Sequence, residues 1–306
     1  MPCRGILDYC SMPKNTASLS RLHRKKCAGN FCLHFKEGRL LRKTGAIGLF
    51  DSGIGGLTVA VEVYRQLPAE STIYFGDTAH VPYGSRNPGE LYRFASRIVD
   101  FLEGEGAKYI IFACNTSSSL SLPILQERKA VPMIGLIKPG VAAALQKTVN
   151  RRIGVIATEA TVKSGAYERE LKRQDENVQV FCQAASRLVP LVEAGETGTP
   201  AAAEAVREYL FPLKEAGIDT LILGCTHYPF LKPLIAGEMG PGVQLVDPAA
   251  ATVEEAGKEL QRLGLAAGGP AVPEHRFVVS GDPAAFQKAA RRFLGRNIGP
   301  VGRVEL

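Results

Sequence analysis

The main part of this 306-residue chain has too few cysteines for a disulfide framework. Four of the seven cysteines lie within residues 1–44, and only Cys114, Cys182 and Cys225 follow. Three thiols cannot form the paired bridges of a small secreted scaffold, and free thiols persist in a reducing compartment. The sequence therefore predicts a cytoplasmic protein whose thiols stay available for chemistry.

Long apolar runs are also missing from the N-terminal part. Residues 1–44 contain neither the apolar core of a signal peptide nor a stretch long enough to cross a membrane. No membrane partner is expected. The whole chain is 45% hydrophobic and has 32 glycines, which is typical of an α/β protein with ample core.

Beyond residue 44 the chain has almost no net charge. Residues 1–44 hold ten Lys or Arg against Asp8 and Glu37, and the later residues hold 27 basic and 28 acidic side chains. A neutral body offers no basic surface for phosphates, so no nucleic-acid partner is expected. We interpret residues 1–44 as a basic, disordered extension whose cysteines and histidines have spacings that fit no common zinc finger.

From Ala46 onward, short apolar runs alternate with amphipathic stretches, as in strands of a parallel sheet joined by helices. The apolar runs predict strands at residues 46–50, 72–75, 109–113, 133–136, 153–157, 178–182, 220–224, 244–246 and 276–279. The amphipathic stretches predict helices at residues 57–67, 90–103, 118–128, 165–173, 201–216, 251–263 and 283–293.

Nine strands are many for one compact sheet with short connections, and one strand-to-cysteine element occurs twice. We therefore predict two similar doubly wound α/β domains whose parallel sheets face each other across a central cleft. The first domain would comprise residues 45–138 plus 250–306, and the second residues 139–249.

The repeated element places two cysteines in matched positions. Cys114 follows the apolar residues 110–113, and Cys225 follows residues 221–224. Polar residues come directly after each thiol and could not enter an apolar core without partners, whereas Cys182 is interpreted as a core residue. Ligands bind at the carboxyl ends of parallel strands. Two thiols there would suit an enzyme that takes a proton from one face of a carbon and returns one to the other.

A glycine-rich turn at residues 51–56 closes the first predicted strand. Its glycines permit a tight turn, and the N–H groups of the following helix suit a substrate carboxylate. A dinucleotide fingerprint is disfavoured because Thr58 stands where the third glycine belongs. Asp51 either caps the helix or binds a substrate ammonium group, and both interpretations stay open.

Two further features lie near these motifs. His227 follows Cys225 by two residues and could help move the proton of a thiol, whose unperturbed pKa is about 8.5. A zinc site at Cys225 and His227 is disfavoured, because no further cluster of metal ligands supports it. The loop at residues 76–86 offers the hydroxyl groups of Tyr83 and Ser85 to a carboxylate.

Four segments, residues 48–58, 75–84, 113–116 and 224–229, together resemble the glutamate racemase family, and the resemblance extends over about residues 46–300. It implies two α/β domains and a cofactor-independent enzyme that interconverts L- and D-glutamate and supplies the D-isomer for peptidoglycan synthesis. It also implies a homodimer.

The resemblance assigns roles to individual residues. Cys114 would take the proton from D-glutamate and Cys225 from L-glutamate, with Asp51 and His227 assisting the thiols. Glu193 would be the acidic residue beside the histidine. The implied substrate-binding positions are Asp51, Ser52, Tyr83, Gly84, Asn115, Thr116, Thr226 and His227.

The sequence leaves two alternatives open and disfavours a third. Aspartate racemases share the two-cysteine plan but typically have Glu where this chain has His227, which favours glutamate. A non-catalytic regulatory protein of the gyrase-inhibiting type is a second alternative. A pyridoxal enzyme is disfavoured because no lysine lies within the four motifs.

Overall fold

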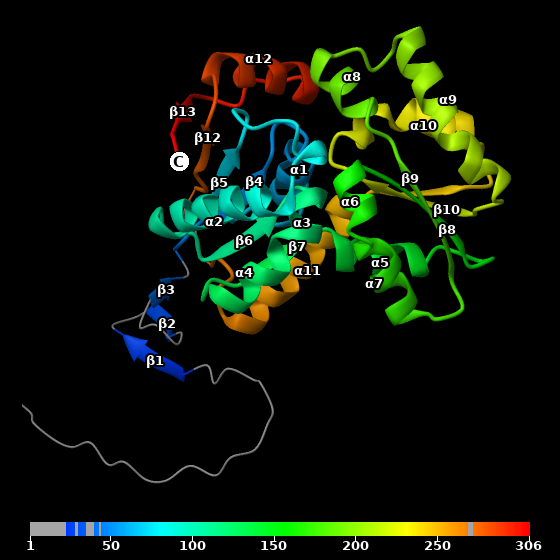
Figure 1. The fold of residues 1–306 in the computed structure, drawn as a ribbon. Coiled ribbons are helices and arrows are strands. Elements are labelled where there is room, and N and C mark those ends of the chain that lie inside the picture. Colours follow the sequence, from blue (N-terminus) through cyan, green and yellow to red (C-terminus); the bar gives the residue numbers. More distant parts are fainter. Residues whose placement is uncertain (1–22, 28–29, 35–39, 43, 269–271) are drawn as a thin grey trace, which may run out of the picture.

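The computed structural model describes residues 23–27, 30–34, 40–42, 44–268 and 272–306. Two parallel sheets lie side by side, each with helices packed on it (Figure 1). The predicted α/β architecture with two parallel sheets is therefore confirmed. We call the parts built on them the six-stranded half and the four-stranded half.

The six-stranded sheet has the order β13-β12-β5-β4-β6-β7, and the four-stranded sheet has the order β11-β10-β8-β9. The strands of the first are β4 (Ile47–Asp51), β5 (Thr72–Gly76), β6 (Tyr109–Phe112), β7 (Met133–Gly135), β12 (His275–Val279) and β13 (Val301–Arg303). Those of the second are β8 (Arg152–Ala157), β9 (Gln179–Ala184), β10 (Thr220–Gly224) and β11 (Gln244–Val246).

The helices of the six-stranded half are α1 (Leu57–Gln66), α2 (Pro88–Gly104), α3 (Asn115–Leu120), α4 (Leu122–Arg128), α11 (Pro248–Leu263) and α12 (Pro283–Leu294), with a 3-10 turn η1 (Tyr83–Ser85). Those of the four-stranded half are α5 (Ile137–Leu145), α6 (Glu159–Lys163), α7 (Ala166–Gln174), α8 (Leu188–Ala194), α9 (Pro200–Glu215) and α10 (Lys232–Met239), with a 3-10 turn η2 (Tyr228–Leu231).

The same strand order is present in both halves. In each, the first four strands along the chain lie in the order second, first, third, fourth: β5-β4-β6-β7 and β9-β8-β10-β11. The direction of winding therefore reverses between the first and third strands, and loops that leave the two strands there diverge and open a crevice for ligands. In both halves the third strand is the one followed by a cysteine of the repeated element.

All nine predicted strands are present, with small shifts at their ends, and seven predicted helical regions are helical. The region predicted as one helix at residues 118–128 is two helices that meet at Ser121, with Pro123 in the first turn of the second. Helices α5, α6, α8 and α10 were not predicted, because they are short or carry proline or glycine. Strand β13 also lacked a signal, since it has three residues and one is glycine.

Strand β6 shows how the core is built on both faces of the six-stranded sheet. Tyr109 and Ile111 pack toward α1 and α11, whereas Ile110 and Phe112 pack toward α2 and α4. Side chains alternate between faces along a strand, so a strand covered on both sides reads as a continuous apolar run. Cys114 continues the second set and is buried with it.

Part of the predicted disordered extension forms a sheet of its own. Strands β1 (His23–Cys27), β2 (Asn30–His34) and β3 (Leu40–Arg42) pair antiparallel and join neither parallel sheet. The rest of residues 1–43 lies outside the described residues, as do the side chains of these strands. Domain boundaries at residues 138, 139, 249 and 250 stay a prediction.

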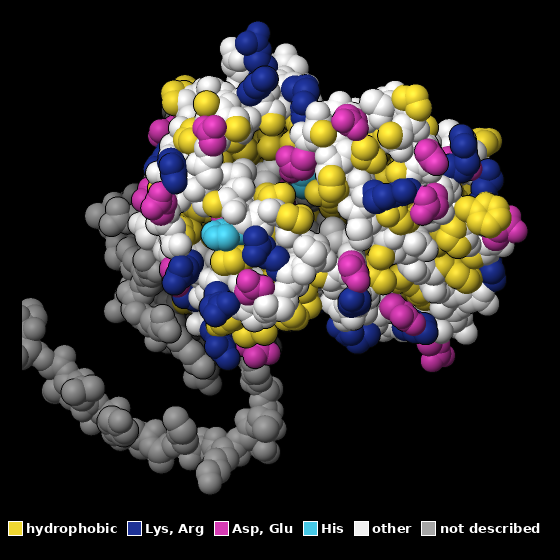
Figure 2. Space-filling model, turned by 45° about the horizontal axis from the view of Figure 1, so that its top comes forward, with side chains coloured by type: hydrophobic (Ala, Val, Ile, Leu, Met, Phe, Trp, Pro, Cys, Tyr) yellow, Lys and Arg dark blue, Asp and Glu magenta, His cyan; other side chains and the backbone are white. Residues whose placement is uncertain are grey.

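None of the helices in the described part of the chain combines the length and apolar character that crossing a membrane would require. On the face shown in Figure 2, acidic and basic side chains are interspersed over both halves.

We predict that Phe112→Ala lowers the free energy of unfolding by about 3–5 kcal/mol. The side chain is fully buried, and its ring meets that of Phe50 edge to face with centroids 5.1 Å apart. Chemical denaturation would measure the change. Val149→Ala is the matched control, because Val149 is 92% exposed. Equal midpoints for the two variants would contradict this account of the core.

Candidate active site

The two cysteines of the repeated element line one cavity between the halves. Cys114 follows β6 and Cys225 follows β10, so each thiol lies at the carboxyl end of the third strand of its half. Both side chains are buried, and both line a cavity of about 120 Å³. The sequence had predicted this placement from the two apolar runs.

Most of the residues singled out in the sequence also line this cavity. The predicted ones are Ser52, Tyr83, Gly84, Cys114, Asn115, Thr116, Cys225, Thr226 and His227. Asp51 and Glu193 do not line it and reach the site from behind other side chains. Lining residues that the sequence reasoning missed include Ser186, Val189 and Pro190 from the start of α8 and the turn before it.

Thr158 is another missed lining residue, and a signal for it was available. It follows β8, the first strand of its half, just as Ser52 follows β4, the first strand of the other half. Its hydroxyl lies 2.9 Å from the hydroxyl of Thr116, which comes from the six-stranded half. Comparing the ends of equivalent strands would have identified it.

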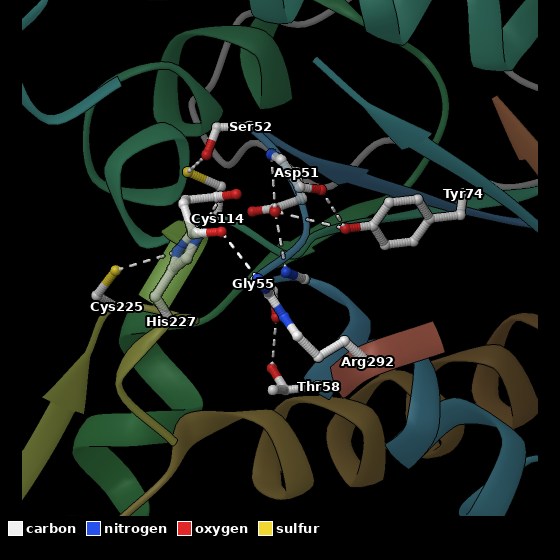
Figure 3. A network of polar contacts seen from close by, with 12 residues as sticks. Asp51, Ser52, Gly55, Thr58, Tyr74, Cys114, Cys225, His227 and Arg292 are labelled. Carbon is white, nitrogen blue, oxygen red and sulfur yellow. Dashed lines mark hydrogen bonds and ion pairs between the residues drawn. The ribbon is translucent and has the colours of Figure 1, made fainter. Parts of the chain in front are cut away.

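Asp51 holds the glycine-rich turn before α1 rather than capping the helix, whose N-cap residue is Gly56. Oδ2 of Asp51 accepts hydrogen bonds from the N–H groups of Gly53 (3.0 Å) and Gly56 (2.9 Å), and the hydroxyl of Tyr74 lies 3.4 Å away (Figure 3). Its Oδ1 is buried and has no hydrogen-bond partner among the residues that the structure describes. Burial raises the pKa of this carboxyl, while the positive charge of His227 and the N–H groups oppose the rise.

Cys114 is held as a neutral thiol in this environment. Its Sγ lies 3.9 Å from Oγ of Ser52 and donates to it (Figure 3). Burial, and next the negative charge of Asp51, raise the pKa of Cys114 to about 12. Both causes disfavour the thiolate.

Cys225 has an imidazole and a carboxylate as its neighbours instead. Its Sγ lies 3.7 Å from Nδ1 of His227, and Nε2 of the same ring lies 2.6 Å from Oε1 of Glu193. Burial by itself lowers the pKa of His227, but the bonds to Cys225 and Glu193 outweigh it and raise that pKa well above its usual value. The three side chains form a thiol–imidazole–carboxylate series, whose first two members Figure 3 labels.

A polar wall closes the cavity beside Cys114. Asn115 accepts a hydrogen bond at Oδ1 from the hydroxyl of Tyr167 (2.6 Å), a residue of the four-stranded half. Its Nδ2 is buried and has no partner among the described residues, while Ser117 lies close enough to Cys114 to hydrogen-bond the thiol. Buried polar atoms without partners are uncommon, and here the amide supplies a donor that a polar ligand could use.

The hydroxyl of Tyr83 already has a hydrogen-bond acceptor within the protein. It donates a short hydrogen bond to Asp77, which also accepts from Ser280. A phenol has one proton to donate, and here Asp77 accepts it; substrate binding by Tyr83, which lines the cavity, stays a prediction. Gly84 lies so close to Thr158 that a Cβ at this position would be 2.9 Å from the threonine Cβ.

No three His, Cys, Asp or Glu side chains within the described residues are grouped to hold a metal ion. What the site does contain is two buried thiols, each with its own ionisable neighbour, on either side of one small cavity. Such a pair can exchange protons with an atom placed between them.

Comparison with known proteins identifies the family. Residues 57–256 match the Asp/Glu/Hydantoin racemase family. The chain is 56% identical to the glutamate racemase of Desulforudis audaxviator over 266 residues, which cover 85% of this chain and 97% of that one.

Solved structures similar to this chain point to the same family. The crystal structure of the glutamate racemase isoform RacE1 from Bacillus anthracis superposes with a TM-score of 0.83 at 41% identity, covering 86% of this chain and 98% of that one. The glutamate racemase of Francisella tularensis in complex with D-glutamate superposes with a TM-score of 0.80 at 36% identity, with the same coverage. The chain therefore belongs to the Asp/Glu racemase family and, within it, to the glutamate racemases.

Proposed function

We propose that this protein interconverts L- and D-glutamate without a cofactor, using Cys114 and Cys225 as its two acid/base groups. The observation that carries the proposal is the placement of both thiols at equivalent strand ends on one cavity. D-glutamate, the ligand of the Francisella tularensis structure, is a substrate of matching size and polarity. The product would supply peptidoglycan synthesis.

The reaction needs the two thiols in opposite protonation states. The thiolate of Cys225 takes the α-proton of L-glutamate, so the C–H bond breaks and an S–H bond forms. The electron pair left on carbon takes the proton of the Cys114 thiol from the opposite face. In the reverse direction, Cys114 takes the proton of D-glutamate and Cys225 returns one.

Each thiol needs help to reach its thiolate form. For Cys225, the adjacent imidazole of His227 can accept the proton or stabilise the charge, and Glu193 orients the ring and stabilises its charged form. For Cys114, the negative charge of Asp51 opposes ionisation. A substrate ammonium group beside the free oxygen of Asp51 would offset that charge.

The remaining polar atoms would bind the substrate carboxylates. The amide Nδ2 of Asn115 is oriented by Tyr167 and free to donate, and Ser52, Thr116 and Thr226 add hydroxyl groups on the cavity wall. The cavity is small and its thiols are buried, so a substrate that fills it would displace the water from around the reacting carbon. Exclusion of water strengthens every electrostatic interaction with the developing carbanion.

The oligomeric state and the location of the protein stay predictions. We retain the homodimer implied by the family resemblance and the cytoplasmic location implied by the free thiols.

Replacing either catalytic thiol is the direct test. Cys114→Ala and Cys225→Ala should each lower racemisation by at least about 10³-fold, because each removes the only proton carrier on one face of the substrate. Circular dichroism of L-glutamate in deuterium oxide, with deuterium incorporation at the α-carbon, would measure this. Cys182→Ala is the matched control and should keep full activity, since Cys182 lies on β9 away from the cavity; it is exposed, so its interpretation as a core residue was wrong. A full rate in Cys114→Ala would remove the mechanism.

Asp51→Asn should make Cys114 more reactive while making the enzyme less active. Removing the negative charge lowers the pKa of Cys114, and the amide oxygen can still accept from Gly53 and Gly56. Alkylation of Cys114 by iodoacetamide at pH 8, followed by peptide mass spectrometry, should be faster by several-fold to about tenfold. Cys182 in the same protein serves as the internal reference. Unchanged or slower alkylation of Cys114 would refute the role given to the Asp51 charge.

Gly55→Ala, a change in the six-stranded half, should lower activity by displacing site residues of the four-stranded half. A Cβ on Gly55 would lie 2.5 Å from Oγ1 of Thr226 and 2.6 Å from Nδ1 of His227, so both side chains must move. We expect kcat/KM to fall about 10²-fold. Gly104→Ala is the matched control, because a Cβ there meets nothing within 4 Å. Equal kcat/KM in the two variants would argue against the close approach at Gly55.

A further inference from the structure

The last turn of α12 reaches across from the six-stranded half to the end of α8 in the four-stranded half. Arg292 donates from Nη2 to the carbonyl oxygen of Glu193 (2.9 Å) and from Nη1 to that of Ala194 (3.2 Å). The two helices lie next to each other in Figure 1, and Figure 3 shows Arg292 below Gly55, to one side of His227. The backbone that carries the Glu193 carboxylate is therefore held by a residue from the other half.

A glycine makes this approach feasible. Gly195, which ends α8, has φ +78°, and a Cβ there would lie 2.2 Å from Nη1 of Arg292. The guanidinium occupies the space that a side chain at position 195 would need. A cation at the C-terminus of a helix satisfies carbonyl groups that have no partner within the helix and interacts favourably with its dipole.

The residue after Arg292 makes a second contact across the halves. The ring of Phe293 packs on that of Phe230 with centroids 4.3 Å apart. Phe230 lies in η2, three residues after His227, and its N–H donates to the carbonyl oxygen of His227 (3.2 Å). Arg292 therefore contacts the end of α8, which carries Glu193, and Phe293 contacts η2, which follows His227.

We propose that Arg292 and Phe293 are positioning residues that keep Glu193 and His227 in hydrogen-bonding register behind Cys225. The inference rests on the proposed function, in which Cys225 is the acid/base group for L-glutamate. The two residues act through the backbone of α8 and through η2.

The need for such a support follows from the length of α8 and the exposure of Glu193. The helix has seven residues and includes Pro190, so its own hydrogen bonds hold its end weakly. The Glu193 side chain is 29% exposed, while its partner His227 is 3% exposed. Water can therefore compete for the carboxylate if the end of α8 moves, whereas the imidazole stays buried.

The support acts on one side of the reaction only. The Asp51 carboxylate beside Cys114 accepts from the N–H groups of Gly53 and Gly56 and from the hydroxyl of Tyr74; α12 contacts Tyr74 through Phe286, one turn and more before Arg292. Loosening the last turn of α12 should therefore raise the barrier for proton transfer at Cys225 and leave the barrier at Cys114 nearly unchanged.

This asymmetry gives a measurement that a general structural defect would not produce. Enantiomers have an equilibrium constant of one, so kcat/KM must fall equally in both directions. The α-deuterium isotope effects on kcat/KM need not change equally. If proton transfer at Cys225 becomes the slower step, the isotope effect should rise for L-glutamate and fall for D-glutamate.

We would measure both isotope effects for the full-length wild type and for Arg292→Gln, with α-deuterated L- and D-glutamate. Arg292→Gln should lower kcat/KM roughly tenfold, less than the about 10²-fold loss that a 1 Å misplacement can cause. Phe293→Leu should change the isotope effects in the same directions. Arg291→Gln is the matched control, because Arg291 is an exposed neighbour in the same helix turn and should leave all four values unchanged.

Two results would overturn the proposal: a kcat/KM of Arg292→Gln within twofold of wild type, or a loss of activity with both isotope effects unchanged or shifted together. Failure of the proposed function would look different. In that case the wild type itself would show no racemisation and no exchange of the α-hydrogen.

Discussion

The site depends on one geometric constraint, the meeting of the carboxyl edges of two parallel sheets. Parallel strands deliver all their carboxyl ends to one edge, and the winding reverses between the first and third strands of each half. Both cysteines follow a third strand, so the two crevices bring the thiols to one cavity. A slip of one residue in either strand would turn its thiol to the other face of the sheet.

The two thiols sit in chemically unequal surroundings despite this shared topology. Cys114 is next to a carboxylate whose negative charge raises the thiol pKa, whereas Cys225 is next to an imidazole that can carry positive charge. The two thiols therefore have neighbours of opposite charge, which suits the proposed two-base mechanism with one thiol and one thiolate.

The two halves approach each other closely at positions where the six-stranded half has a glycine. Gly55 lies against Thr226 and His227, and Gly84 lies against Thr158. Each contact brings a loop of the six-stranded half onto a strand end of the four-stranded half. Packing at this distance brings polar groups of both halves around one buried cavity, where electrostatic interactions are stronger than in bulk water.

The sequence by itself determined the strands, the two thiols and the glycine-rich turn, because buried parallel strands are continuous apolar runs and polar residues mark where they end. Local pattern could not reveal that the Tyr83 hydroxyl donates its proton to Asp77 or that Ser186 and Val189 line the cavity. Only the tertiary structure decided those contacts, and it alone placed Arg292 against the end of α8. They join residues far apart in the chain, and their partners are set by how the two halves pack.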